Sequence, residues 1–286
     1  MARGFPEPEP AGLARRSRRL SDQETSQRML ATAVARVHRS GLTVSLDHIS
    51  LEEVIRDAGV SRSAVYRRWP YKDLFFSDLV KELAKDATPP IVPGELELIR
   101  SVVAGRQDWL NTPELRHGLV VELFRQLALF DFEAVYGSTE WRTYLALHAT
   151  FLSLADGQLR DEVQAILARS EQNRIALIAA AWERLAGLLG YRLRPELAIT
   201  YETIATLLTA SLRGLVIMAL STPGIAGYRT RARPFGATEA AEWSQPALGM
   251  ASLAWAALEP DPAVEWDRDR ITRIRQELSH LTSRAT

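Results

Sequence analysis

The sequence predicts an all-α protein with a small N-terminal helical domain and a larger C-terminal helical domain. Apolar residues recur three and four positions apart over most of the chain, which is the period of an amphipathic helix. No stretch of useful length alternates apolar and polar residues as a half-buried strand would. The length of 286 residues exceeds that of a typical single domain and fits two.

The first predicted helix follows Ser21. The order Ser21-Asp22-Gln23-Glu24 places a hydroxyl at the cap and a carboxylate three residues later, which is a capping box. The helix should end near Gly41. Its apolar stripe consists of Met29, Leu30, Ala33, Val34 and Val37.

Three shorter helices follow. Ser50 opens a second capping box, and Gly59 closes that helix. Ser61 caps a helix over 62–69, which Pro70 ends. A fourth helix is predicted over 71–85. Its buried stripe should comprise Leu74, Phe75, Leu79 and Leu83.

Prolines 89, 90 and 93 mark a connector, and the chain beyond it is predicted to be helical almost throughout. Thr112 with Pro113 behind it is typical of a helix start. An irregular loop is expected over 221–237. The predicted helices span 95–110, 113–132, 138–156, 160–189, 195–220, 243–258 and 264–281.

Composition excludes several classes of protein. Cysteine is absent, so disulfides, thiolate zinc sites and a cysteine nucleophile are ruled out. The alternation of proline and glutamate from Pro6 to Pro10 does not fit a signal peptide. The longest apolar stretch found, 247–258, is too short to cross a bilayer. We therefore expect a cytoplasmic protein with no membrane partner.

Charge is balanced overall and uneven along the chain. The 35 basic and 35 acidic residues cancel, yet residues 1–72 hold 13 basic and 8 acidic side chains. Residues 1–20 should form a disordered basic arm, either a solvated tail or an arm that contacts DNA phosphate. A basic N-terminal part favours an anionic partner for that part.

An enzyme is the main alternative class, and no motif supports it. The chain has no glycine-rich phosphate loop, no paired-histidine helix motif and no nucleophile elbow. Its five histidines are scattered. We therefore predict no catalytic residue, no metal site and no cofactor.

The stretch 50–72 has the spacing of a helix-turn-helix, with Gly59 in the turn. Val65 and Trp69 are four residues apart and can face inward together. Arginine, serine and tyrosine side chains on the other faces can reach base edges and phosphates. On spacing alone, an ordinary solvated helix face is the alternative interpretation.

Residues 25–85 resemble the DNA-binding domain of the tetracycline-repressor (TetR) family of bacterial transcription regulators. The resemblance follows the run from Ala58 to Leu74: a glycine turn, a helix with Val65-Tyr66 near its middle, an aromatic residue and a break, then Lys72 with an acidic residue and leucine behind it. Glu52 and Ser63 depart from the family pattern. By resemblance, the DNA-binding residues are Ser50, Arg62, Ser63, Ala64, Tyr66, Arg67, Arg68 and Lys72.

The resemblance also implies how the two domains work together. Residues 21–87 would bind a palindromic operator in double-stranded DNA. Residues 94–286 would bind a small-molecule effector and form a homodimer through the helices 160–189 and 195–220. Effector and DNA would each weaken the binding of the other, as expected of a repressor.

Six aromatic and histidine side chains are candidates for lining the effector pocket: Trp109, His117, Trp141, Tyr144, His148 and Trp182. Trp141, Tyr144 and His148 share a helix face by their spacing. The alternative is that these residues are ordinary core aromatics with hydrogen-bonded histidines. A second hypothesis for the whole chain is a small-molecule-binding or partner-binding helical protein whose DNA-binding part is idle, and the acid at Glu52 favours it.

Overall fold

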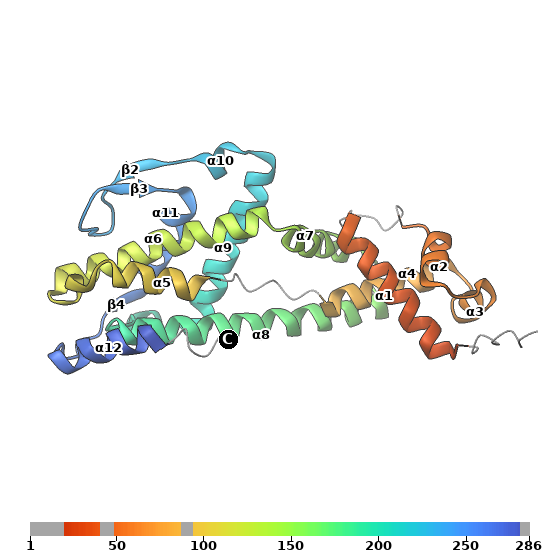
Figure 1. The fold of residues 1–286 in the computed structure, drawn as a ribbon, viewed down its shortest axis with the longest axis horizontal. Helices are drawn as coiled ribbons and strands as arrows, with labels where there is room; N and C mark the ends of the chain where they lie inside the picture. Colours follow the sequence, from red (N-terminus) through yellow and green to blue (C-terminus); the bar gives the residue numbers. More distant parts are fainter. Residues whose placement is uncertain (1–19, 41–48, 87–93, 281–286) are drawn as a thin grey trace, which may run out of the picture.

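The computed structural model describes residues 20–40, 49–86 and 94–280. Helices dominate these residues, and each strand among them is only three residues long, which confirms the all-α class. The molecule is elongated, with α1–α4 together at one end (Figure 1). We call residues 20–86 the head and residues 94–280 the body. The predicted basic arm lies outside the described residues except for Leu20.

The head helices begin and end largely where the sequence predicts. The Ser21 N–H donates to Glu24 Oε2 at 2.8 Å and the Glu24 N–H donates to Ser21 Oγ at 3.1 Å, which confirms the first capping box. Gly59 ends the second helix with a left-handed φ of 64°. The helices are α1 (Asp22–Ser40), α2 (Leu51–Ala58), α3 (Arg62–Arg68) and α4 (Lys72–Asp86).

The four head helices share an apolar core. The predicted buried stripe of α4 is correct for Phe75, Leu79 and Leu83 and wrong for Leu74, which is 48% exposed. Each residue turns the helix by about 100°, so Leu74 cannot share a face with both Phe75 and Leu79. The other helices contribute, among others, Met29, Val37, Val54, Val65 and Trp69 to this core.

The body is also helical, and caps set several of its helix starts as predicted. Thr112 and Ser138 accept hydrogen bonds from the first turns of α6 and α7. The helices are α5 (Glu95–Ala104), α6 (Pro113–Gly137), α7 (Thr139–Leu152), α8 (Gln158–Leu188), α9 (Tyr201–Ser221), α10 (Gly224–Gly227), α11 (Gln245–Ala257) and α12 (Arg268–His280).

Three predicted helix starts are wrong because side-chain caps lie further along the chain. Pro195 begins only a short 3₁₀ turn, and α9 starts after Thr200, whose Oγ1 accepts from the Thr203 N–H at 3.3 Å. Ser244 Oγ accepts from the Ala247 N–H at 3.2 Å and so starts α11. Asp267 caps α12 in the same way.

Other predicted helix ends also move. The helix expected over 95–110 stops before Gly105 and is followed by a 3₁₀ turn, Gln107–Leu110. Helix α6 continues past residue 132 to Gly137, and α7 ends at Leu152 rather than near residue 156. Helix α8 ends before Gly190 as expected, with φ 75° at that glycine.

Two antiparallel strand pairs were not predicted. Strand β1 (Tyr191–Leu193) pairs with β4 (Leu258–Pro260), and β2 (Thr230–Ala232) pairs with β3 (Ala241–Trp243). Three residues are too few to show an alternating pattern, and β1 and β4 are far apart in the sequence. The loop predicted over 221–237 therefore contains α10 and β2.

The last helix, α12, packs on the rest of the body. Ile274 of α12 is buried, and the Arg270 side chain donates to the carbonyls of Gly187 and Leu188 at the end of α8. A Cβ atom at Gly190 would lie 2.9 Å from the Trp266 ring, so this close contact requires glycine.

Two body helices carry the main contacts to the head. Helix α4 packs along α8, where Lys81 Nζ lies 2.8 Å from Glu162. Helix α7 touches both α1 and α4. Because α8 runs from the head into the body (Figure 1), it links the two directly.

Helix α9 is long and apolar enough to cross a membrane by length and composition. A core helix of a soluble protein passes the same test, so this one helix among the described residues is weak support for a membrane span. The prediction that 247–258 is the longest apolar segment is wrong, because the apolar window of α9 is longer. Arg213 divides that window in the sequence, which is why it was missed.

Candidate nucleic-acid interface and candidate effector sites

Helix α3 is held in the head by two side chains. Val65 and Trp69 are buried, at 0% and 1% exposure, which confirms the predicted inward face. The Trp69 Nε1–H donates to Asp78 at 2.9 Å. The Trp69 and Phe75 rings pack edge to face, with their centres 5.2 Å apart. With both halves of this short helix anchored, its remaining faces have a fixed orientation.

The side chains predicted to contact DNA lie on the outside of the head. Ala64 is half-buried and Ser50 is the cap of α2, where its Oγ accepts from the Glu53 N–H at 3.4 Å. Exposed side chains are Arg62, Ser63, Tyr66, Arg67, Arg68 and Lys72. The structure therefore brings the α3 candidates and Lys72 onto the outer surface of the head.

Acidic side chains already engage several of these groups. The Tyr66 hydroxyl donates to Glu52 Oε1 at 3.1 Å, and Arg67 pairs with Asp22. Arg68 lies 3.4 Å from Asp78 and over the Trp69 ring. By contrast, Arg62 forms no hydrogen bond or ion pair with any residue that the structure describes.

Comparison of the chain with protein-family models, with curated proteins and with solved structures gives no match. The surface around α3 is therefore interpreted from its own chemistry. Its guanidinium, ammonium and hydroxyl groups are hydrogen-bond donors, and phosphate oxygens and guanine edges are acceptors. The surface is suited to an anionic, acceptor-rich partner.

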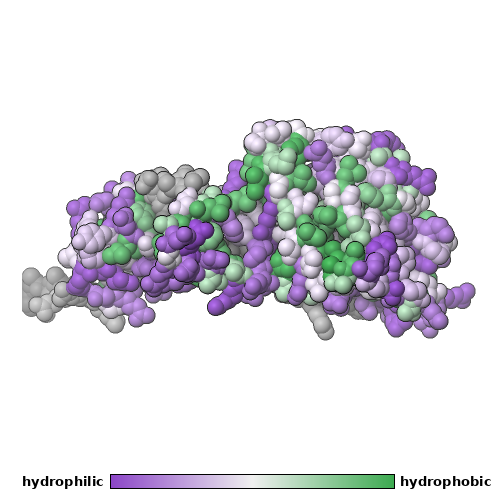
Figure 2. Space-filling view, turned by 180° about the vertical axis from the view of Figure 1, so that it is seen from behind, coloured by the Kyte–Doolittle hydropathy of each residue, from purple (hydrophilic) through white to green (hydrophobic). Residues whose placement is uncertain are grey.

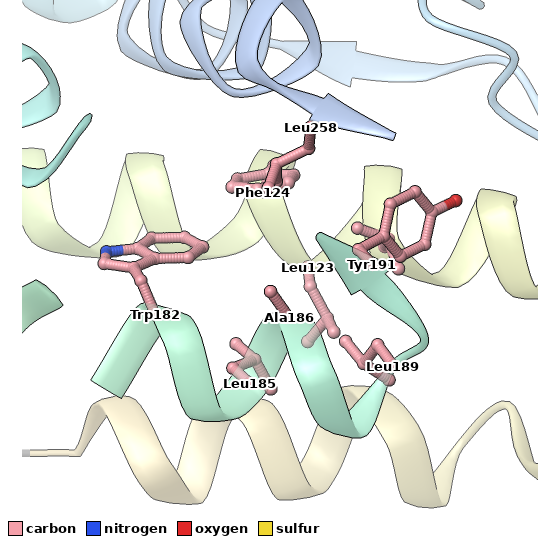
Figure 3. A pocket seen from close by; sticks show the side chains of 9 residues that line it. Leu123, Phe124, Trp182, Leu185, Ala186, Leu189, Tyr191 and Leu258 are labelled. Atoms are coloured by element: carbon pink, nitrogen blue, oxygen red, sulfur yellow. The ribbon is translucent and has the colours of Figure 1, made fainter. Parts of the chain in front are cut away.

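The body contains an apolar cavity of about 20 Å³ (Figure 3). Phe124 and Trp182 stack beside it with ring centres 5.0 Å apart and planes 10° from parallel. The other lining residues are Val120, Leu123, Leu185, Ala186, Leu189, Tyr191 and Leu258. They come from α6, α8, β1 and β4, so the cavity lies where the first strand pair meets the helices.

A hydrogen-bonded histidine supports one wall of this cavity. His117 Nδ1 lies 3.0 Å from the Tyr191 hydroxyl and His117 Nε2 lies 2.7 Å from the Phe235 carbonyl. The His117 ring also packs on Trp255 at 4.5 Å. Burial raises the pKa of Tyr191 to about 12, so its hydroxyl stays protonated at neutral pH.

The six predicted pocket residues separate into two groups. Trp182 lines the cavity, and His117 contacts the lining residue Tyr191. Trp109 is half-buried beside Gly118 of α6. Trp141, Tyr144 and His148 lie together on α7, with successive ring centres 5.2 and 4.3 Å apart, which confirms their shared face but places them outside the cavity lining.

The α7 aromatics belong to a second site, which we call the junction cluster. Five helices, α5 to α9, contribute to it. Its members are Glu95, Asp131, Trp141, Tyr144, Glu171, Arg174 and Arg213. Arg213 donates to both Glu171 oxygens at 2.9 and 3.0 Å, and the Tyr144 hydroxyl donates to Glu171 at 2.5 Å. The guanidinium groups of Arg174 and Arg213 each lie 5.2 Å from the Trp141 ring centre.

The junction cluster contains strongly perturbed ionisable groups. Burial, with the neighbouring Glu95, raises the pKa of Asp131 to about 8, and burial also raises the pKa of Glu95. These two acids therefore hold one proton between them at neutral pH. Burial alone would raise the pKa of Glu171, but the Tyr144 hydrogen bond and the Arg213 charge lower it. Burial lowers the pKa of Arg174.

None of the charged members of the junction cluster was among the predicted site residues. Arg213 had a visible signal, since it is the one charged residue in the middle of the apolar helix α9. The proximity of Arg174 to Glu95 on α5 and Asp131 on α6 left no signal, because it depends on how distant segments pack.

Proposed function

We propose that this chain is a TetR-type transcription regulator that binds a palindromic DNA operator as a homodimer and releases it when a small molecule binds the body. The resemblance of residues 25–85 to the DNA-binding domain of that family supports the proposal. Helices α2 and α3, joined at Gly59, serve in it as a helix-turn-helix. We propose the role of a repressor for this chain.

The observation that carries this proposal is the construction of α3. Its inward face is fixed by Val65 and Trp69, while Arg62, Ser63 and Tyr66 point outward. Seven residues of helix span about 10 Å, which fits within a major groove about 12 Å wide. Arg62 has no acidic partner among the described residues and is free to pair with a guanine edge.

Phosphate contacts would fix the orientation of the helix on the duplex. The N-terminus of α2, capped by Ser50, presents backbone N–H groups, and Arg68 and Lys72 follow at the C-terminal end of α3 and the start of α4. These groups would contact phosphates next to the bases that α3 reads. Binding should therefore weaken steeply as salt increases.

The homodimer is supported by an apolar face on α8 and α9. Only 33% of the apolar window of α9 is buried in the single chain. Helix α9 passes behind α6 in Figure 1, and the same side seen from behind carries broad hydrophobic patches (Figure 2). Large exposed apolar side chains on the two helices are Leu177, Leu207, Ile217, Met218 and Leu220. A second copy would cover this face and place two α3 helices on one operator.

The cavity beside Trp182 is a candidate for the effector, but in this state it is small. A volume of about 20 Å³ holds roughly one water molecule, whereas pockets for ordinary small molecules span roughly 300–1,000 Å³. An effector at this place would have to separate Trp182 from Phe124. Such an opening would displace α8, which also contacts the head.

The proposal is tested by a binding selection on genomic DNA fragments with the purified protein, repeated over a range of salt. We expect enrichment of a palindromic sequence, bound by a dimer. The Arg62→Ala variant should lose about 1–3 kcal/mol of binding to the enriched site and relax specificity at one base pair in each half-site. Arg231→Ala, which removes an exposed arginine from β2 of the body, is the control and should bind like the original protein. Sequence-blind binding by both proteins would contradict the proposal.

The second candidate function is ligand or partner binding by the body with an idle head. The pairing of Tyr66 with Glu52 and of Arg67 with Asp22 favours it, since both donors are already occupied. Replacing Tyr66 by Phe and Arg67 by Ala together separates the two candidates. An idle head predicts no change in DNA binding, whereas a regulator should lose specific binding while its helical content stays the same.

A further inference from the structure

Buried polar atoms without a partner concentrate in the junction cluster. Among the described residues, four such side-chain atoms belong to it: Asp131 Oδ1, Trp141 Nε1, Arg174 Nε and Arg213 Nε. Three of the four are N–H donors. Buried polar groups are nearly always hydrogen-bonded, so a local group of unpaired donors calls for an acceptor that binds there.

Arg174 is the member that most needs a partner. Its guanidinium lies over the Trp141 ring, and it forms no hydrogen bond or ion pair with any residue that the structure describes. Glu171, Tyr144 and Glu95 act on its charge electrostatically, without a hydrogen bond to it. The neighbouring Arg213 is different, because Glu171 accepts two hydrogen bonds from it. A largely buried cation without a partner is costly to the folded state.

We propose that the junction cluster binds the carboxylate group of a small organic anion, with Arg174 as its cation and the Trp141 Nε1–H as a neighbouring donor. A guanidinium donates two parallel hydrogen bonds to a carboxylate, which a planar anion accepts well. The nearby acids oppose this binding less than their number suggests, because Glu95 and Asp131 share a proton. The Glu171 charge is already matched by Arg213.

Binding at this place would reach the head by a short route. Trp141 and Tyr144 belong to α7, which contacts α1 and α4, and Arg174 belongs to α8, which packs on α4. If the chain is a regulator as proposed above, the anion is its effector or part of it. By linkage, an anion that favours one position of α7 would change DNA affinity by the same factor as DNA changes anion affinity.

Thermal unfolding of the full chain tests the site without knowledge of the natural ligand. The probes are benzoate, acetate and inorganic phosphate at constant ionic strength, with benzamide as the uncharged counterpart of benzoate. We expect benzoate to raise the Tm by about 3 °C or more at roughly twenty times its dissociation constant, and benzamide to have no effect. A shift with phosphate alone would overturn the assignment to a carboxylate.

Two arginine variants distinguish a binding site from a structural cation. Arg174→Met should leave the Tm without probe unchanged or higher, since it removes an unpaired charge, and should abolish the benzoate shift. Arg213→Met is the matched control and should lower the Tm, because it strips Glu171 of its ion pair. If Arg174→Met lowers the Tm as much as Arg213→Met does, Arg174 is structural and the proposal is wrong. It is also wrong if none of the carboxylate probes shifts the Tm of the original protein.

The binding selection on genomic fragments keeps this proposal separate from the proposed function. A benzoate shift that depends on Arg174, combined with sequence-blind DNA binding, would retain the anion site and reject the regulator. Specific DNA binding, combined with no change of Tm on addition of benzoate or acetate, would retain the regulator and reject the anion site.

Discussion

Glu52 illustrates how one side chain affects the proposed DNA-binding surface in two ways. It lies in the first turn of α2, where a carboxylate is favoured by the helix dipole, and it accepts a hydrogen bond from Tyr66. The same carboxylate would repel a phosphate that approaches Ser50. Its charge and its acceptor oxygen therefore have opposite consequences for DNA binding, and they can be separated by substitution.

Glu52→Gln keeps an acceptor for Tyr66 and removes the charge. We expect affinity for duplex DNA to rise about three- to fivefold, which corresponds to about 0.7–1 kcal/mol. Fluorescence anisotropy with labelled duplex at two salt concentrations measures it. Glu97→Gln, a similar exposed acid on α5 of the body, should leave affinity unchanged. Unchanged or weaker binding by Glu52→Gln would show that the Glu52 charge does not oppose DNA binding.

Gly118 provides a residue-scale prediction in the body. A Cβ atom there would lie 1.9 Å from Thr238 Oγ1 and 3.1 Å from Thr238 Cβ. Gly118→Ala should therefore lower the free energy of unfolding by about 1–3 kcal/mol, although alanine usually stabilises a helix interior. Chemical denaturation measures the change. In a Thr238→Gly background the same substitution should cost much less, and an equal cost in both backgrounds would exclude this contact as the cause.

At the scale of elements, local signals predicted the helices well and pairing between distant segments poorly. Caps at Thr112 and Ser138 and the glycine after α8 are short-range features, and each marks a helix end within a residue or two. The helix start predicted at Pro195 is wrong, because proline is also found at the first position of a 3₁₀ turn. The strand pair β1–β4 depends on chain segments far apart in the sequence, so no window of sequence reveals it.

The α8–α9 face yields the main prediction at this scale. Replacing both Leu207 and Ile217 by glutamate would bury charges in the proposed dimer interface while leaving each protomer folded, because both side chains are exposed in the single chain. We expect a monomer by light scattering after size exclusion, with unchanged helical content. Leu152→Glu, at a still more exposed leucine at the end of α7, is the control and should remain a dimer.

The same face shows what the sequence pattern of α9 could not predict, namely which side of the helix is covered by the same chain. The apolar pattern of α9 on two sides predicts burial on both sides, and it cannot say which side the same chain covers. The structure buries Ile204, Leu208 and Leu212 within the chain and leaves Leu207 and Ile217 uncovered. Intramolecular packing accounts for one stripe, and the other is the face that the proposed dimer would cover.

At the scale of the whole molecule, the junction cluster makes stability depend on pH. The pKa of Asp131 is raised from 3.8 to about 8 by burial and by Glu95, while Arg174 acts in the opposite direction. Between pH 3.8 and about pH 8, Asp131 is ionised in the unfolded chain and protonated in the folded chain. The free energy of unfolding therefore falls as pH rises through this range. Glu122 and Glu171 have lowered pKa values, and their contributions are lost only as pH falls below about 4.5.

Asp131→Asn imitates the protonated acid at every pH. We expect it to flatten the fall of Tm between pH 5 and pH 8 and to raise the Tm at pH 8 by roughly 3 °C or more. Calorimetry over that range measures both. Glu122→Gln should instead lower the Tm at pH 7, because Glu122 accepts from Arg125 and Arg106, and should leave the slope unchanged. An identical slope in the original protein and Asp131→Asn would contradict this assignment.

The two candidate regions also differ in how far sequence could predict them. The outer face of α3 was predicted in detail, because a single short helix with two anchors fixes which side chains point outward. The junction cluster was only partly predicted, through Trp141 and Tyr144. Its charged members come from four helices, α5, α6, α8 and α9, and their proximity follows from the packing of the whole body.

Helix α8 can act as a lever between the body and the head. Its 31 residues form one continuous rod about 46 Å long, pinned at its far end by Arg270 and pressed against α4 near its start. A tilt of about 5° about the pinned end moves the other end by about 4 Å. A rearrangement of less than one side-chain width inside the body is thus amplified at the head. In the proposed dimer two such rods would be related by the twofold axis. A motion of about 1 Å at mid-rod would then move each head by about 2 Å and change the separation of the two α3 helices by about one base-pair step.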